Sequence, residues 1–291
     1  MRITELVEQL SAAEAEARPS PEQRITFVKG FVSALTPEDR TAVVALMGML
    51  DFASPPAEKQ VLILLHGIRT AGVWQESIRQ MFDGTGVEVI PIGYGFFDVV
   101  RFLIPGLRSG PVTHVASQIQ SVKREHSEAA ISIIAHSFGT YILSQLLYPD
   151  RGFRFKRIVL CGSIIPAEYA WENVQGRPDR QEILNDVGTR DVWPVLAQTT
   201  TWGYGSSGTF GFKQYALLDR FHDFTHSDFF GESWVKTYWI PFICNGVVNN
   251  SPWDSKRPTP PVYFGILTVL HVKYVILACI LVAVFYFLQH K

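Results

Sequence analysis

The chain has 291 residues and a formal net charge of −1, with 47% hydrophobic and 18% charged residues. This length allows one large domain or two modest ones, while the low charge excludes a disordered chain and a coiled coil. The near-neutral charge also disfavours nucleic acid as a partner, since such proteins carry a basic face.

Residues 1–55 are expected to be a helical N-terminal segment. Residues 20–23 read Ser-Pro-Glu-Gln, a capping box with proline at the first helical position, and residues 36–39 repeat this start signal. The segment carries no recognisable chemistry. Binding of a protein partner through these helices is left open as their role.

Residues 57–243 alternate between strand-like and helical patterns. The run 60–65 is apolar apart from its first residue, as in a strand buried on both faces. Further strands are expected at 87–92, 130–135, 157–161 and 181–184, with helices around 74–82, 112–122 and 141–147. Such alternation predicts an α/β protein with a mostly parallel sheet and helices on both faces.

A serine stands where one of these strands ends and a helix begins. Ser137 is flanked by the small residues Ala135 and Gly139, two positions before and two after it. This pattern is typical of a nucleophile elbow, a strained turn that lifts the hydroxyl above the carboxyl edge of the sheet. Glycine is usual at both flanking positions, so Ala135 departs from the pattern. A helix-capping serine is the alternative interpretation.

A nucleophilic serine also needs groups that stabilise the oxyanion formed during attack on a carbonyl. The expected donors are the backbone N–H of Phe138 and that of Gly67 or Ile68, in the loop after strand 60–65. A glycine there lets the backbone approach the substrate oxygen. We interpret His66, at the start of this loop, as structural.

These motifs together resemble the α/β-hydrolase family, in particular its serine esterases and lipases, over about residues 57–240. In that family the catalytic residues follow the order serine, acid, histidine along the chain. The segment 188–194 is similar to the family's acid-bearing loop and makes Asp191 the expected acid, with Asp186 as the alternative. The segment 224–230 is similar to the loop that carries the histidine, which favours His226 over His222.

The resemblance implies that Ser137, Asp191 and His226 cleave a carboxylic ester, with lipid esters as one option, through an acyl-enzyme and without a cofactor. A zinc site built from His222 and His226 is disfavoured because phenylalanines interleave with the polar residues. Two alternatives remain open. One is a non-catalytic hydrolase-fold protein that binds a ligand or acts as a scaffold, and the other is an effector hydrolase regulated by a partner.

The C-terminal region differs in composition from the rest. Residues 245–261 are rich in Asn, Ser, Lys and Pro and are expected to be a linker, whereas 262–288 contain only four residues that are not hydrophobic: Gly265, Thr268, His271 and Lys273. Residues 268–288 as a helix would reach about 31 Å, close to a hydrocarbon core of roughly 30 Å. We expect a single membrane anchor at 262–288. An in-plane anchor and a core or dimer helix are the alternatives.

The remaining signals concern the compartment. Residues 1–17 are charged and rich in Ala and Glu, unlike a secretory signal, and three cysteines form no disulfide framework. A single-pass or tail-anchored protein with a cytoplasmic catalytic domain is therefore expected.

Overall fold

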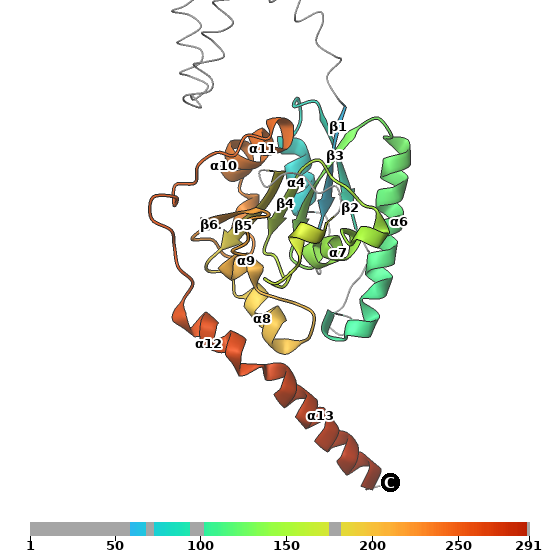
Figure 1. Cartoon of the computed structure of the whole chain (residues 1–291), viewed down its shortest axis with the longest axis vertical. Coiled ribbons are helices and arrows are strands. Elements are labelled where there is room, and N and C mark those ends of the chain that lie inside the picture. The colour runs from blue at the N-terminus through green and yellow to red at the C-terminus, as the bar shows by residue number, and fades with distance from the viewer. Residues whose placement is uncertain (1–58, 68–72, 94–101, 175–181, 290–291) are drawn as a thin grey trace, which may run out of the picture. The chain divides into compact units, whose positions relative to one another are not determined.

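The computed structural model describes residues 59–67, 73–93, 102–174 and 182–289. The helical segment expected at 1–55 and the oxyanion candidate Ile68 lie outside these residues. Six strands form one parallel sheet in the order β2-β1-β3-β4-β5-β6 (Figure 1). They are β1 (Gln60–Leu65), β2 (Val87–Ile92), β3 (Ala130–His136), β4 (Ile158–Cys161), β5 (Ile183–Gly188) and β6 (Leu218–His222). The predicted α/β class with a parallel sheet is confirmed.

Helices lie on both faces of this sheet (Figure 1). Those around the sheet are α4 (Val73–Met81), α6 (Ser109–Glu125), α7 (Phe138–Leu146), α8 (Trp193–Thr200), α9 (Ser207–Phe210), α10 (Glu232–Trp234) and α11 (Ile240–Asn245). β1 shows why both faces must be covered. Its side chains Ile63 and Leu65 belong to the core beneath α6 and α7, while Leu62 and Leu64 belong to the core beneath α4 and α11.

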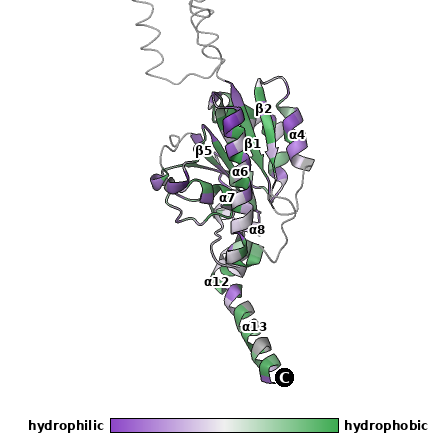
Figure 2. Ribbon diagram, turned by 90° about the vertical axis from the view of Figure 1, so that its right-hand side faces the viewer, coloured by the Kyte–Doolittle hydropathy of each residue, from purple (hydrophilic) through white to green (hydrophobic). Residues whose placement is uncertain are grey.

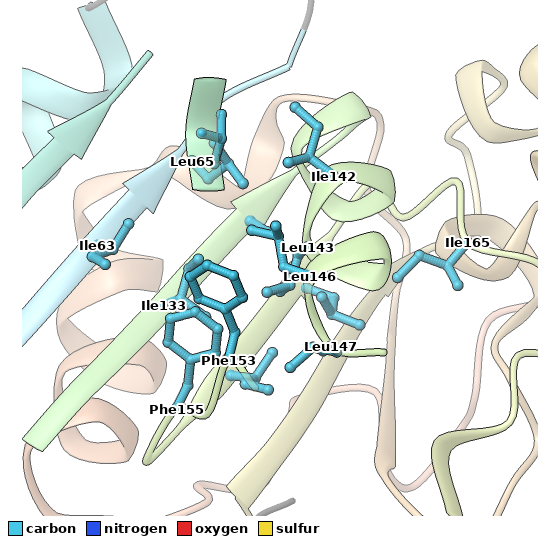
Figure 3. Packing of buried hydrophobic residues seen from close by; sticks show 14 of the residues in the cluster. Ile63, Leu65, Ile133, Ile142, Leu143, Leu146, Leu147, Phe153, Phe155 and Ile165 are labelled. Atoms are coloured by element: carbon cyan, nitrogen blue, oxygen red, sulfur yellow. The ribbon is translucent and has the colours of Figure 1, made fainter. Parts of the chain in front are cut away.

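The first of these cores holds the elbow region in place. Ile133 of β3, Leu143 and Leu146 of α7 and Phe155 are buried together in it (Figure 3). Burial of such side chains stabilises the fold by about 1.5–3 kcal/mol each. The junction between β3 and α7 is therefore fixed by packing on both of its sides.

All strands are parallel, so their carboxyl ends meet at one edge of the sheet. The chain order reverses between β1 and β3, because β2 lies on the other side of β1. Open α/β sheets bind ligands at this kind of switch point. Gly67 follows β1 and Ser137 follows β3, so both lie at the switch point.

The apolar C-terminal segment forms two helices, α12 (Val262–Leu270) and α13 (Val272–Gln289). They are separated at His271, whose backbone is left-handed with φ 44°. α12 packs against α8 through its buried Phe264, whereas α13 extends away from the sheet and is largely hydrophobic (Figures 1 and 2). Within the described residues, one stretch, Val262–Cys279, is long and apolar enough to cross a membrane by length and composition.

The expected linker, 245–261, is packed against the last strand of the sheet. The Trp253 ring lies 5.6 Å from that of His222, and the Arg257 guanidinium lies 3.2 Å from the centre of the Phe221 ring. The Arg220 side chain also donates a hydrogen bond of 3.4 Å to the carbonyl oxygen of Asn249. The segment thus runs beside β6 from α11 to α12 (Figure 1).

Candidate active site

Ser137 occupies a strained turn at the junction of β3 and α7. Its backbone has φ 56° and ψ −124°, a conformation that L residues rarely adopt and that costs about 1–3 kcal/mol. Its N–H donates a hydrogen bond of 3.1 Å to the carbonyl oxygen of Cys161, at the end of β4. The turn is held by this bond and by the buried strand and helix on either side.

Two glycines allow the backbone to pass close to this serine. A Cβ atom on Gly67 would lie 2.6 Å from the Ser137 Cβ atom, and one on Gly139 would lie 2.7 Å from the carbonyl oxygens of Leu65 and His66. Neither position has room for a side chain. Gly67, the second residue after β1, therefore lies directly beside the serine, where an oxyanion donor is needed, and Phe138 begins the helix on the serine's other side.

Asp191 and His226 are joined by a short hydrogen bond. The Nδ1 atom of His226 lies 2.7 Å from the Oδ2 atom of Asp191, which is fully buried. The second oxygen, Oδ1, accepts a hydrogen bond of 3.0 Å from the backbone N–H of Trp193 at the start of α8. Both carboxylate oxygens are thus engaged, which fixes the orientation of the acid and of the imidazole that it holds.

The loop that carries His226 lies beside the elbow. His136, which precedes Ser137, directs its Nε2 atom to the carbonyl oxygen of His226 at 3.0 Å, and the two imidazole centres are 4.4 Å apart. Among the described residues no hydrogen bond joins the Ser137 hydroxyl to His226. Catalytic hydrogen bonds are often long or poorly aligned before substrate binds.

Three loops at one sheet edge therefore carry a serine, an aspartate and a histidine, in this order along the chain. The serine follows a buried strand in a strained turn that opens a helix, and the strands beside it follow the order β1-β3-β4-β5-β6. This combination distinguishes α/β hydrolases from other doubly wound sheets. The chain has the α/β-hydrolase fold.

Known proteins are similar to this chain in structure only. No protein-family model matches the sequence, and a search of curated proteins finds no match. Among solved structures, an alpha-beta serine hydrolase homologue from Coxiella burnetii is 13% identical and covers 67% of this chain and 88% of its own, with a TM-score of 0.40.

Two further structures are similar to the same extent. A cold-adapted esterase from an Arctic intertidal metagenomic library is 15% identical and covers 62% of this chain and 80% of its own, with a TM-score of 0.41. A serine hydrolase without a lid from Xanthomonas campestris is 14% identical and covers 68% of this chain and 87% of its own, with a TM-score of 0.40. The fold assignment rests on the sheet order and serine turn of this chain.

Gly162 lies directly against the Asp191–His226 pair, although the sequence analysis gave it no role. A Cβ atom there would lie 2.8 Å from the Cε1 atom of His226 and 3.3 Å from the Oδ2 atom of Asp191, and its φ of +55° also favours glycine. The signal in the sequence is a glycine directly after β4. The need for glycine at this position could not be predicted, because the side chain that leaves no room for a Cβ atom, His226, is far away along the chain.

His136 was also given no role by the sequence. Its side chain is fully buried, and its ring contacts Trp74 and Phe230 at centroid distances of 6.0 Å and 4.9 Å. Burial, together with the neighbouring His226, holds the pKa of His136 well below its usual value. The neutral ring donates its one proton, on Nε2, to the His226 carbonyl oxygen.

The alternative residues, Asp186 and His222, belong to a separate buried network. The Asp186 carboxylate accepts hydrogen bonds from Arg220 at 2.7 Å, from His222 at 2.9 Å and from the indole N–H of Trp239 at 2.7 Å. Burial alone would raise the pKa of Asp186, but the charge of Arg220 and the bond from His222 outweigh it and lower the pKa. Asp186 and His222 therefore pair with each other and with Arg220, away from Ser137.

Within the described ranges, no group of three or more His, Cys, Asp or Glu side chains is arranged to hold a metal ion. His222 ends β6 and His226 lies in the following loop, so the two histidines do not lie on one turn of a helix.

A groove of about 860 Å³ opens along the outer side of α7. It is lined by Tyr141, Tyr148, Tyr169 and Glu168, among other residues. The Tyr141 ring stacks on Phe138, the residue after Ser137, at a centroid distance of 5.5 Å. The groove thus begins about one helical turn from the elbow, although it includes none of the three polar residues discussed above.

Proposed function

We propose that this chain is a serine hydrolase that cleaves a carboxylic ester through an acyl-enzyme intermediate. The observation that carries this proposal is the 2.7 Å bond between His226 and the buried Asp191, beside a serine held at φ 56°. A strained serine turn is costly to maintain, and strain of this kind is concentrated at functional sites.

In the proposed reaction, His226 accepts the proton of the Ser137 hydroxyl through Nε2 as the oxygen attacks the ester carbonyl. Asp191 fixes the proton of the imidazole on Nδ1 and stabilises the imidazolium that forms. The backbone N–H of Phe138 and that of Gly67 or Ile68 stabilise the oxyanion, with each donor contributing about 3–4 kcal/mol. His226 then protonates the leaving alcohol, and water releases the acyl group by the same route.

We further propose that α13 tethers this hydrolase to a membrane, with the catalytic domain in the cytoplasm. Support comes from the apolar stretch Val262–Cys279, of which 6% is buried, and from the exposed apolar side chains of α13, which include Val275, Leu281 and Phe285. A core helix would hide these side chains, and a signal sequence would stand near the N-terminus. The described cysteines, Cys161, Cys244 and Cys279, are all free, as is usual in a reducing compartment.

The proposed chemistry is tested with the full chain in detergent, using a serine-directed fluorophosphonate and p-nitrophenyl butyrate. Wild type is expected to be labelled and to hydrolyse the ester. Ser137→Ala is expected to lose both properties, and Asp191→Asn is expected to lose roughly 10⁴-fold in kcat because the imidazole tautomer is no longer held.

Ser121→Ala, on α6, is the matched control and is expected to behave as wild type. Full labelling of Ser137→Ala would contradict the assignment of the nucleophile. A wild-type chain that is folded but neither labelled nor active on any ester would instead be a non-catalytic hydrolase-fold protein.

A further inference from the structure

We propose that the catalytic edge of the sheet lies on the surface of the bilayer that holds α13, and that the substrate is a carboxylic ester of a membrane lipid. This proposal rests on the function proposed above, because it concerns the substrate and orientation of the same site. It is argued from the root of α13, from the exposed apolar residues around that root, and from the side chain beside His226.

The root of α13 is fixed to the catalytic domain. The backbone N–H of Val272 donates to the Thr199 hydroxyl at 3.3 Å, and the ammonium group of Lys273 donates to the carbonyl oxygen of Gln198 at 3.4 Å. The ring of Tyr274 lies 6.0 Å from that of Trp202. The start of α13 is therefore bound directly to the end of α8, with no flexible spacer between them.

The other end of α8 lies beside Asp191, the proposed catalytic acid. The helix begins at Trp193, whose N–H holds the Asp191 carboxylate, and it ends beside the residues that contact α13. An eight-residue helix is about 12 Å long. The root of the anchor is thus about one short helix away from the acid, and α8 lies between the sheet and α13 (Figure 1).

Exposed apolar side chains lie near this root and along α8. Before Val262, seven large hydrophobic side chains are exposed among the described residues, and four of them belong to α8, to the residues just after it or to the segment before Arg108. These four, which we call the apolar rim, are Ile104, Leu107, Trp193 and Trp202, with exposed fractions of 46%, 47%, 59% and 40%.

The buried Arg108 ties the two parts of the apolar rim together. Its guanidinium donates to the carbonyl oxygen of Trp202 at 2.7 Å and to the Thr201 hydroxyl at 2.9 Å. Ile104 and Leu107 precede Arg108 in the chain, so they are held near Trp202 and the start of α13. The rim is a fixed surface, because buried bonds rather than exposed side chains connect its parts.

A lipid surface is the occupant that fits this rim. The rim is continuous with the proposed span, and Lys273, Tyr274 and Trp202 are residue types that favour the level of the lipid headgroups. An anchor that leaves the domain at this level brings the rim to the bilayer without any added partner. The apolar side chains would then lie at the boundary of the acyl chains.

One residue of the apolar rim, Trp193, also lies beside His226, the proposed catalytic base. Trp193 is more than half exposed, and its ring centre lies 6.2 Å from that of His226. An ester whose acyl chain lies in the bilayer surface would meet Trp193 on its way to Ser137. A small ester dissolved in water can reach Ser137 without contacting an apolar surface. The apolar rim beside the site therefore favours a lipid ester over a soluble ester as the substrate.

The kinetic test uses the full chain in vesicles of dioleoyl phosphatidylcholine that contain a fluorogenic acylglycerol, with p-nitrophenyl butyrate as the soluble substrate. The double substitution Ile104→Ser and Leu107→Ser is expected to lower vesicle hydrolysis about tenfold, because apolar contact with the lipid is lost. Hydrolysis of the soluble ester should be unchanged.

Val247→Ser is the matched control. Val247 is 43% exposed, but it follows α11, where Ile243 accepts a hydrogen bond from Arg157 at the opposite edge of the sheet. This variant should hydrolyse both esters as wild type does. Equal vesicle hydrolysis by the double variant and wild type would overturn the proposal. Activity of wild type on the soluble ester alone would also overturn it, while leaving the hydrolase assignment intact.

A second measurement does not depend on catalysis. Leu107→Cys and Val247→Cys, each in a background with Cys244→Ser and Cys279→Ser, are labelled with a nitrobenzoxadiazole dye in the same vesicles, since Cys161 is buried. Lipids that carry a doxyl quencher should quench the dye at 107 and not at 247. A dye at 107 that stays in water, or that is shielded from both water and the quencher by another protein, would overturn the proposal even if no hydrolysis is detected.

Discussion

Substitution of Gly162 by alanine tests the link between backbone geometry and the proposed catalytic base. Gly162 has φ +55°, and alanine in this left-handed region costs about 1–2 kcal/mol. The new Cβ atom would lie 2.8 Å from the His226 Cε1 atom and 2.9 Å from its Nδ1 atom. Ordinary carbon contacts are about 3.5–4.0 Å, so the imidazole must move by about 0.7–1.2 Å.

This movement should affect rate much more than stability. A displacement of about 1 Å in a reacting group can cost roughly 100-fold in rate. We therefore expect Gly162→Ala to lower kcat for p-nitrophenyl butyrate about 100-fold, with little change in KM, since the substrate is still bound. The free energy of unfolding should fall by about 1–2 kcal/mol, the cost of the backbone conformation.

Gly84→Ala separates the two effects. Gly84 has a similar φ of +78°, but a Cβ atom there would meet nothing within 4 Å. This variant should show a similar loss of stability with unchanged kcat, when thermal unfolding and hydrolysis are measured in the same detergent. A Gly162→Ala protein with wild-type kcat would refute the reasoning, because His226 would then tolerate the displacement or have no part in the rate.

Two other predictions concern buried charge. Asp186→Asn should lower the free energy of unfolding by about 3–5 kcal/mol in denaturant titrations, since it leaves the buried Arg220 without its charged partner. The control is Asp223→Asn, which breaks an exposed pair with Arg190 and should lower it by less than about 1 kcal/mol. Equal losses in the two variants would contradict this prediction. His136 is neutral in the folded chain because its pKa lies well below 6.5. As pH falls below about 6.5 the unfolded chain binds the extra proton, so stability should fall by up to about 1.4 kcal/mol per pH unit. His136→Phe should reduce this slope, and an unchanged slope between pH 7 and 5 would contradict the account.

The local features of the fold could be predicted from the sequence. The apolar run before Ser137, its small neighbours and the helical pattern after it are all within a few residues of one another. They define the β3–α7 junction, which the structure forms at the expected place. β1 and β2 likewise form at the residues expected from the sequence, 60–65 and 87–92.

The choice between Asp186 and Asp191 could not be settled locally. Both follow the same apolar run, and β5 extends to Gly188, beyond the expected end at 184. It continues because the polar Asp186 finds buried partners in Arg220 and Trp239, much later in the chain. The role of Gly162 is hidden for the same reason, because its close neighbour is His226.

The break at His271 is another feature that depends on distant residues. The hydropathy of 262–288 suggests one continuous helix, and nothing in the sequence around His271 is a strong helix breaker. In the structure α12 packs on α8, and α13 begins where Val272 meets Thr199. The partner surface, rather than the local propensity, decides where the helix is interrupted.

The packing of residues 246–261 beside β6 has a practical consequence for shortening the chain. β6 is the last strand of the sheet, and a free edge strand is a template for pairing with other molecules. Trp253 and Arg257 pack over this strand, so the segment shields it. A version cut after Pro261 would lose the proposed membrane anchor and keep this shield. One cut after Asn245 would expose β6 and should aggregate, even though both retain every strand of the sheet.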